Sequence, residues 1–163
     1  MKILLLNGSA GVQAATAVLA LPAVLEFPEL RQSEDYRDDV HRVVSSLSEH
    51  DRFEIVATCD DKVVGGAVIV VDDDQHVGVC LSLQWQYVLP EYRSKQLGRY
   101  FIRQLLRQAG WAGIKNVCYT HRTGLGKYTL TYREVQHGQE GKGLGRQDQE
   151  VYREVGPARC GYA

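Results

Sequence analysis

The sequence has no long hydrophobic run. The apolar stretch from Met1 to Leu6 contains one lysine and ends at Asn7, which makes it too short for a signal peptide or a transmembrane helix. The sequence therefore predicts no membrane-spanning helix, and we expect a cytoplasmic protein.

The sequence also lacks an excess of charge of either sign. Its 19 Lys and Arg residues against 20 Asp and Glu residues give a formal net charge of -1. There is thus no overall attraction to nucleic acid or anionic lipid, and any site for a polyanion must be local. A length of 163 residues with 44% hydrophobic residues predicts one soluble, compact domain.

Cysteine is scarce, and no metal-type C-x-x-C pair occurs among the four cysteines. Cys59, Cys80 and Cys118 lie inside apolar runs, so we expect reduced, mostly buried thiols. The acidic run from Asp72 to Asp74 lacks the regular spacing and closing Glu of a calcium loop. We interpret it as a solvated hairpin turn and expect no metal site.

Apolar patterning predicts a strand, two helices, a three-strand antiparallel meander, a helix and two further strands, in that order. Runs and alternations bounded by Gly or Asp mark the strands, and a period of about 3.6 marks the helices. The expected strands are Lys2–Leu6, Phe53–Ala57, Val63–Val71, Val77–Val88, Asn116–Thr120 and Tyr128–Val135; the expected helices are Val12–Leu21, stopped near Pro22, Asp38–His50, and one that follows the loop Leu89–Lys95 and ends at Gly110.

The composition changes after Val135. Gly, Gln and charged residues dominate from there on, with almost no apolar residue before Val151. Such a segment cannot bury a core of its own. We therefore expect one domain over residues 1–135 and a polar C-terminal tail over residues 136–163. A tail with so little to bury is most easily ordered on a partner chain, so Gln136 to Ala163 is a candidate protein contact.

The segment from Val88 to Arg99 has the strongest signal for a binding site. A long strand runs into a basic loop, and the loop opens directly into a helix. Unpaired N–H groups in a first helical turn, together with the helix dipole, stabilise a phosphate or pyrophosphate. Arg93, Lys95 and Arg99 add positive charge at the same place. An ordinary strand-to-helix connection with solvated basic residues is the alternative.

This segment resembles motif A of the GNAT acetyltransferases. The matching residues are Val88-x-Pro90-Glu91-Tyr92-Arg93, followed by Arg93-x-x-Gln96-x-Gly98 at the start of an apolar-faced helix. The order of elements from Lys2 to Val135 is also the GNAT order. The resemblance implies a single α/β domain with a GNAT-like mixed sheet, an antiparallel meander and helices on both faces.

The resemblance also implies binding of acetyl-CoA as the acyl donor. Backbone around Tyr87 and Val88 would pair with the pantetheine arm, and N–H groups from Arg93 to Arg99 would hold the pyrophosphate. Gln96 stands where the family usually has its first glycine, and its side chain is expected to crowd the loop. The implied cofactor-binding residues are Tyr87, Val88, Arg93, Ser94, Lys95, Gln96, Leu97, Gly98 and Arg99.

Acetyl transfer to an amine also needs a base. Many GNAT members have a carboxylate on the strand before motif A, where this chain has Gln84 and Gln86, and an amide cannot act as a base. His121 is the best substitute, and Tyr128 or Tyr132 could protonate the departing thiolate. The alternatives are that His121 caps a strand or binds a partner, and that both tyrosines pack as strand residues.

Two functions remain open from the sequence. The first is an acetyl-CoA-dependent N-acetyltransferase. Most GNAT members have a further helix after the position of His121, whereas this chain has a Gly-rich turn from Thr123 to Lys127. His121-Arg122-x-Gly124-x-Gly126-Lys127-Tyr128 resembles GNAT-like proteins of tailed bacteriophages. The second function is therefore a catalytically silent structural or accessory phage protein, located in the host cytoplasm or the virion, with its tail bound to a partner.

A third interpretation rests on the N-terminal segment. The run from Leu6 to Gly11 could open a flavodoxin-like or nucleotide-binding domain. That fold needs repeated βαβ units, whereas the middle of the chain is predicted to be an antiparallel meander, so this interpretation is the weakest.

Overall fold

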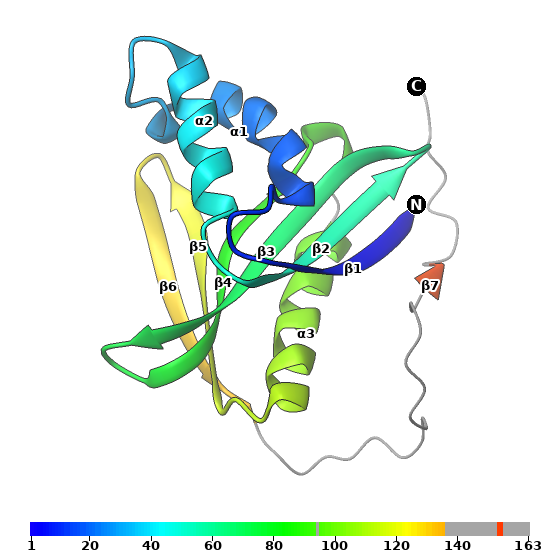
Figure 1. Cartoon of the computed structure of the whole chain (residues 1–163), viewed down its shortest axis with the longest axis vertical. Helices are drawn as coiled ribbons and strands as arrows, with labels where there is room; N and C mark the ends of the chain where they lie inside the picture. Colours follow the sequence, from blue (N-terminus) through cyan, green and yellow to red (C-terminus); the bar gives the residue numbers. More distant parts are fainter. Residues whose placement is uncertain (94, 136–152, 155–163) are drawn as a thin grey trace.

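A seven-stranded mixed sheet forms the centre of the protein, in the order β6-β5-β4-β3-β2-β1-β7 (Figure 1). The computed structural model describes residues 1–93, 95–135 and 153–154. Every pair of neighbouring strands is antiparallel except β4 and β5, which are parallel. The strands are β1 (Lys2–Gly8), β2 (Arg52–Cys59), β3 (Lys62–Asp74), β4 (Gly78–Val88), β5 (Asn116–Gly124), β6 (Lys127–Glu134) and β7 (Arg153–Glu154).

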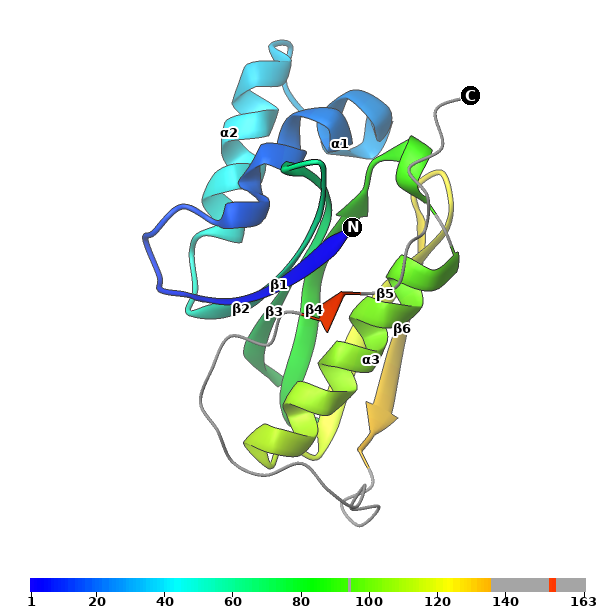
Figure 2. The same cartoon turned by 90° about the vertical axis from the view of Figure 1, so that its right-hand side faces the viewer.

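Helices cover both faces of the sheet. Figure 2 shows α1 and α2 on one face and α3 on the other. The helical elements are η1 (Ala15–Leu19), α1 (Ala20–Glu26), η2 (Pro28–Leu30), α2 (Tyr36–Leu47), η3 (Pro90–Tyr92) and α3 (Lys95–Ala112). The predicted α/β architecture and order of elements are confirmed. No helix in the described part of the chain is long and apolar enough to cross a membrane.

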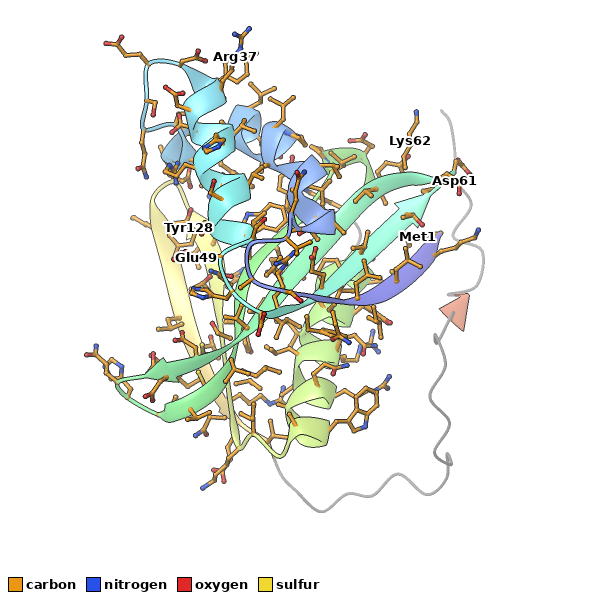
Figure 3. All side chains as sticks on the ribbon, in the orientation of Figure 1. Met1, Arg37, Glu49, Asp61, Lys62 and Tyr128 are labelled. Carbon is orange, nitrogen blue, oxygen red and sulfur yellow. The ribbon has the colours of Figure 1, made fainter. Side chains whose placement is uncertain are left out.

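Several predicted boundaries are wrong. The helix predicted over Asp38–His50 is Tyr36–Leu47, and the strand predicted to end at Thr120 continues to Gly124. Pro22 does not stop a helix but lies in the first turn of α1, where a missing N–H removes no bond within that helix. Helix α3 runs past Gly110 to Ala112 and is followed by Gly113 at a φ of 69°, a left-handed conformation that favours glycine. The β3–β4 turn lies after Asp74, because the acidic run belongs to the exposed end of β3. The predicted turn at Asp60 and Asp61, by contrast, is present at the end of β2, near the Asp61 label of Figure 3.

The apolar core has one layer on each side of the sheet. On one side, strand residues such as Leu81, Leu83 and Val117 pack against Phe101 and Leu105 of α3. On the other side, a layer under η1, α1 and α2 comprises Ala14, Ala17, Ala20, Val24, Val43, Leu47, Val68 and Val70. The face of α3 that the sequence predicted to be apolar is therefore the face that the sheet buries.

An extra residue in β4 reverses which side chains face α3. Val68 of β3 pairs with Trp85 while Ile69 pairs with Leu83, so Gln84 has no partner and forms a β-bulge. Since side chains alternate along a strand, one inserted residue moves all later side chains to the opposite face. Leu83 therefore contacts the α3 layer, whereas Trp85 belongs to the α1 and α2 side.

The cysteine predictions are partly confirmed. Cys80 and Cys118 are buried free thiols on adjacent parallel strands, with their Sγ atoms 3.7 Å apart. Burial raises the pKa of the Cys80 thiol to about 12, so this thiol is protonated and unreactive at neutral pH. Cys59 is disulfide-bonded, and the prediction of a reduced thiol is wrong there. The predicted tail lies outside the described residues, apart from the two residues of β7, which pair with β1.

A buried ion pair joins β2 to the start of η1. Arg52 Nε donates to Glu54 Oε1 at 2.8 Å, and both side chains are at most 3% exposed. The second oxygen of Glu54 accepts hydrogen bonds from the amide and the hydroxyl of Thr16. Arg52 also donates to the carbonyls of Ser9 and Val12. Every charged group of the pair thus has partners, which a buried pair requires.

We expect Arg52→Ala to lower the free energy of unfolding by about 3–5 kcal/mol, because it leaves the Glu54 carboxylate buried without its counter-charge. Lys115→Ala is the matched control. It breaks the exposed pair between Lys115 and Glu134 and is expected to cost less than about 1 kcal/mol. Urea denaturation followed by circular dichroism measures both. Equal losses in the two variants would show that the buried network does not anchor η1.

Candidate functional site

Strands β4 and β5 separate at the end of the sheet where α3 begins. Their parallel ladder runs from Cys80 and Asn116 to Leu83 and Tyr119 and ends there. Strand β4 nevertheless continues to Val88, and β5 continues to Gly124. The bulge at Gln84 coincides with the end of the ladder. Residues 84–88 therefore have no strand partner on the side of β5, and a bound chain could pair with their main-chain groups.

The first turn of α3 lies at the mouth of this gap. The N–H groups of residues 95–97 have no acceptor within the helix, and the helix dipole adds positive potential there. A Cβ atom added to Gly98 would meet no atom within 4 Å, so the space over this turn is open. Gln96 is exposed and does not line the neighbouring cavity. Leu97 instead packs into the core.

A basic cavity of about 640 Å³ lies between α3 and the surface of β4, β5 and β6. It joins the predicted residues Gly98, Arg99 and His121 in one site. Arg103 and Arg133 also line it, although sequence analysis did not single them out. The lining contains no Asp or Glu among the described residues; its members are Gln86, Gly98, Arg99, Ile102, Arg103, Leu106, Tyr119, Thr120, His121 and Arg133.

Gln86 has an unsatisfied amide in the wall of this cavity. Its Oε1 atom is buried and accepts no hydrogen bond from the described residues. An acceptor left without a donor costs about 1–3 kcal/mol. Gln86 is thus a polar residue of the cavity wall whose acceptor atom has no partner in the described part of the chain.

The two predicted catalytic tyrosines lie away from this cavity. Tyr132 pairs with Cys118 on the sheet face opposite to the one that Arg133 presents, and its hydroxyl donates to Asp74 at 2.9 Å. Burial and this hydrogen bond raise the pKa of Tyr132 to about 12. Tyr128, labelled in Figure 3 near the β5–β6 turn, donates to Glu29 at 3.2 Å. The structure therefore brings His121, and neither tyrosine, to the basic cavity.

Arg93 holds the loop between β4 and α3 in place. Its guanidinium forms an ion pair with Glu26 of α1, and its Nε donates to the Val88 carbonyl at 3.0 Å. Its amide donates to the Pro90 carbonyl at 3.2 Å. Both groups that were predicted to meet a phosphate thus have partners in the protein. Ser94 and the side chain of Lys95 lie outside the described residues.

The segment from Glu26, the last residue of α1, to Glu29 of η2 contacts both strands that border the gap. Tyr87 of β4 points to this segment and donates to Glu26 at 2.7 Å, while Glu29 accepts from Arg122 of β5 at 2.6 Å. Phe27 lies between them, with the Arg122 guanidinium 5.0 Å from its ring centre. Burial raises the pKa of Tyr87 to about 12. Sequence analysis missed these pairs because their members are 61 to 93 residues apart.

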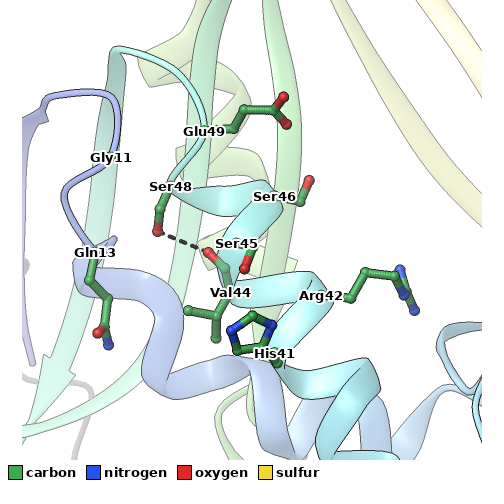
Figure 4. A pocket seen from close by; sticks show the side chains of 9 residues that line it. All are labelled: Gly11, Gln13, His41, Arg42, Val44, Ser45, Ser46, Ser48 and Glu49. Carbon is green, nitrogen blue, oxygen red and sulfur yellow. Dashed lines mark hydrogen bonds between the residues drawn. The ribbon is translucent and has the colours of Figure 1, made fainter.

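A second cavity, of about 770 Å³, lies between α2 and the loop that precedes η1 (Figure 4). Its serines serve the fold, since Ser48 accepts from the Ala14 amide at 3.0 Å and donates to the Val44 carbonyl at 2.9 Å. None of its residues comes from β4, β5 or α3. It is therefore separate from the gap between the two strands.

The comparisons with known proteins agree with this geometry. Residues 21–127 match the family model described as the acetyltransferase (GNAT) family. The chain belongs to the GNAT family of acetyltransferases. The match covers both rims of the gap and all of α3.

Solved GNAT structures share the fold. One is a ribosomal-protein-alanine N-acetyltransferase from Brucella melitensis biovar Abortus 2308, with 16% identity and a TM-score of 0.52 over 76% of this chain and 82% of that one. Another is a predicted acetyltransferase from Clostridium acetobutylicum, determined with acetyl-CoA, with 11% identity and a TM-score of 0.53 over 74% and 82% of the two chains. At these identities the likeness shows the fold alone. A comparison with curated proteins finds no match.

The pair between Glu29 and Arg122 predicts a pH-dependent contribution to stability. The hydrogen bond from Arg122 lowers the pKa of Glu29 from 4.5 to about 2. A lowered pKa in the folded state means that the contribution is complete above about pH 5 and is lost as the pH falls toward 2. We expect Glu29→Gln to be less stable than the wild type in urea denaturation at pH 7, with a smaller difference at pH 3.

Glu49→Gln is the control for this experiment. Glu49 is exposed and lies 4.0 Å from His50, which is also exposed. Its replacement should change stability little at either pH. A difference between the wild type and Glu29→Gln that is the same at both pH values would contradict the assignment.

Proposed function

We propose that the protein is an acetyl-CoA-dependent N-acetyltransferase that acts on an amine. The observation that carries the proposal is the gap between β4 and β5, which presents an unpaired strand edge beside the N-terminal turn of α3. The unpaired strand edge can hydrogen-bond to an extended arm that contains amides, and the N-terminal turn of α3 can bind a pyrophosphate. The basic cavity beside them accounts for the further negative charge of coenzyme A.

The residues of the gap have distinct roles in binding the donor. The main chain of residues 84–87 pairs with the pantetheine arm, whereas the Val88 carbonyl is already engaged by Arg93. The N–H groups of residues 95–97 meet the pyrophosphate, where the missing side chain of Gly98 allows close approach. Arg99 adds a charge-assisted hydrogen bond. Tyr87 and Arg93 act through the fold, because they fix the end of β4 against α1.

His121 is the residue of this site that can move the proton. The amine nitrogen attacks the thioester carbonyl, a C–N bond forms, and the C–S bond breaks to release the thiolate. His121 takes the proton from the nitrogen and returns it to the sulfur, so the products are an amide and free coenzyme A. The geometry favours His121 over Tyr128 and Tyr132 in both steps, since it is the one of the three that lines the cavity.

Acetyl-CoA binding tests the proposal. We expect isothermal titration calorimetry to show binding to the wild type and a loss of about 10- to 100-fold in affinity in Arg99→Glu, the loss of a charge-assisted hydrogen bond. Arg107→Glu is the matched control, because Arg107 is exposed on the same helix outside the cavity. The absence of binding by the wild type at millimolar acetyl-CoA would rule the function out.

Acetyl transfer tests the role of His121. Release of free thiol can be followed with a panel of amines that includes peptides, polyamines and aminoglycosides. For an amine that reacts, His121→Gln should lower kcat by about 100-fold or more and leave acetyl-CoA affinity unchanged. The dependence of the rate on pH should change in the variant, because the group that exchanges the proton has been removed. A variant with full activity and an unchanged pH profile would exclude His121 as the base.

A catalytically silent accessory protein is the second candidate. It is favoured by the absence of any carboxylate from the cavity lining in the described part of the chain. It predicts acetyl-CoA binding without transfer to any amine in the panel. The phage-like pattern of residues 121–128 and the contact of residues 136–163 with a partner chain remain predictions from the sequence. Co-purification of the full chain with a stable partner would support them.

A further inference from the structure

Arg103 and Arg133 face the basic cavity from opposite walls. Arg103 belongs to α3, and Arg133 belongs to β6, where it pairs with Val117 of β5. Neither forms an ion pair with an acidic side chain within residues 1–93 and 95–135. Arg103 Nε donates to the Arg99 carbonyl at 3.4 Å, which leaves most of the donors of this guanidinium available.

The lack of acidic partners distinguishes these arginines from those on the other side of the sheet. Arg93 and Arg122, which lie beside α1 and η2, are paired with Glu26 and Glu29. In the cavity, three arginines and a histidine share a lining without a carboxylate. A concave surface of one charge sign concentrates its potential, so this cavity attracts an anion with more than one charged group.

The connection from β5 to β6 leaves this cavity accessible. The two strands are joined by a short turn between Gly124 and Lys127, so within residues 1–93 and 95–135 no helix between β5 and β6 covers the α3 side of this part of the sheet. A ligand can therefore lie along α3 from its first turn onward. Arg103 is one helical turn beyond Arg99, a rise of about 6 Å. The cavity thus offers two anion sites, one at Gly98 and Arg99 and a second at Arg103 and Arg133.

We propose that Arg103 and Arg133 bind the 3′-phosphate of coenzyme A and make the protein selective for the phosphorylated carrier. This inference rests on the proposed function, in which the first turn of α3 holds the pyrophosphate. A phosphate monoester carries up to two negative charges and three acceptor oxygens, which suits two guanidinium groups that approach from opposite sides.

A carboxylate at the far end of a larger acyl group is the other anion that could meet these arginines. Its position is less favourable. The acyl group must lie near His121, whereas Arg133 pairs with Val117, four residues away along β5. Four residues of strand span about 13 Å. The second anion site is thus set back from the reacting atoms, along the helix on which the pyrophosphate lies.

Binding of coenzyme A and 3′-dephospho-coenzyme A by calorimetry tests the inference. We expect the wild type to prefer coenzyme A by at least about 10-fold, the effect of one charge-assisted contact. Arg103→Gln and Arg133→Gln should each reduce this preference severalfold or more, while affinity for the dephosphorylated carrier changes less than about twofold. Arg107→Gln is the control and should keep the full preference. All three arginines are exposed, and thermal melts will verify that the variants remain folded.

Each alternative outcome gives a clear decision. Equal affinity of the wild type for both carriers would overturn the inference and leave the proposed function intact. Loss of affinity for both carriers to the same extent in the variants would also overturn it. A third result would overturn it too: variants that keep the preference for coenzyme A but lose affinity for succinyl-CoA and not for acetyl-CoA. That result would assign the arginines to an acyl carboxylate. Failure of the wild type to bind either carrier would overturn the proposed function and the inference with it.

Discussion

The bulge at Gln84 is the constraint on which the candidate site depends. Before it, β4 pairs with strands on both sides and presents Leu81 and Leu83 to α3. After it, Trp85 and Tyr87 face α1, and the ladder to β5 has ended. The unpaired residue thus lies where a strand edge opens in the middle of the sheet. If the ladder continued, the main-chain groups of this edge would be hydrogen-bonded to β5, and an acyl donor could not pair with them.

Charge is divided between the two faces of the sheet in a way that the composition conceals. On the α1 side, Glu26 and Glu29 neutralise Arg93 and Arg122 and tie the ends of β4 and β5 to a common segment. On the α3 side, the arginines of the cavity have no acidic neighbour in its lining. The first arrangement joins both strands that border the gap to one segment, and the second gives the cavity a basic lining. A net charge of -1 correctly predicts that any polyanion site is local, but it cannot locate the second arrangement.

Local patterns in the sequence predicted the elements of the fold. They failed where contacts between distant residues determine the position of a side chain. The apolar face that contains Phe101 and Leu105 was sufficient to predict α3, and the motif residues located its first turn. The bulge was not predictable, because the alternation of residues 81–88 does not show which residue is left unpaired. The same limit applies to Tyr132, whose face depends on its pairing with Cys118. Arg133 became a candidate only when β6 brought it to the wall of the cavity.

The chemistry of the cavity gives a reason for an imidazole in place of a carboxylate. In the proposed complex, a carboxylate in this cavity would be repelled by the pyrophosphate, and its negative charge would weaken donor binding. A neutral imidazole can accept a proton without adding negative charge to the site. Gln84 and Gln86 in place of a strand carboxylate, the arginines without an acidic partner in the described residues and the position of His121 are thus all compatible with the proposed binding of an anionic donor.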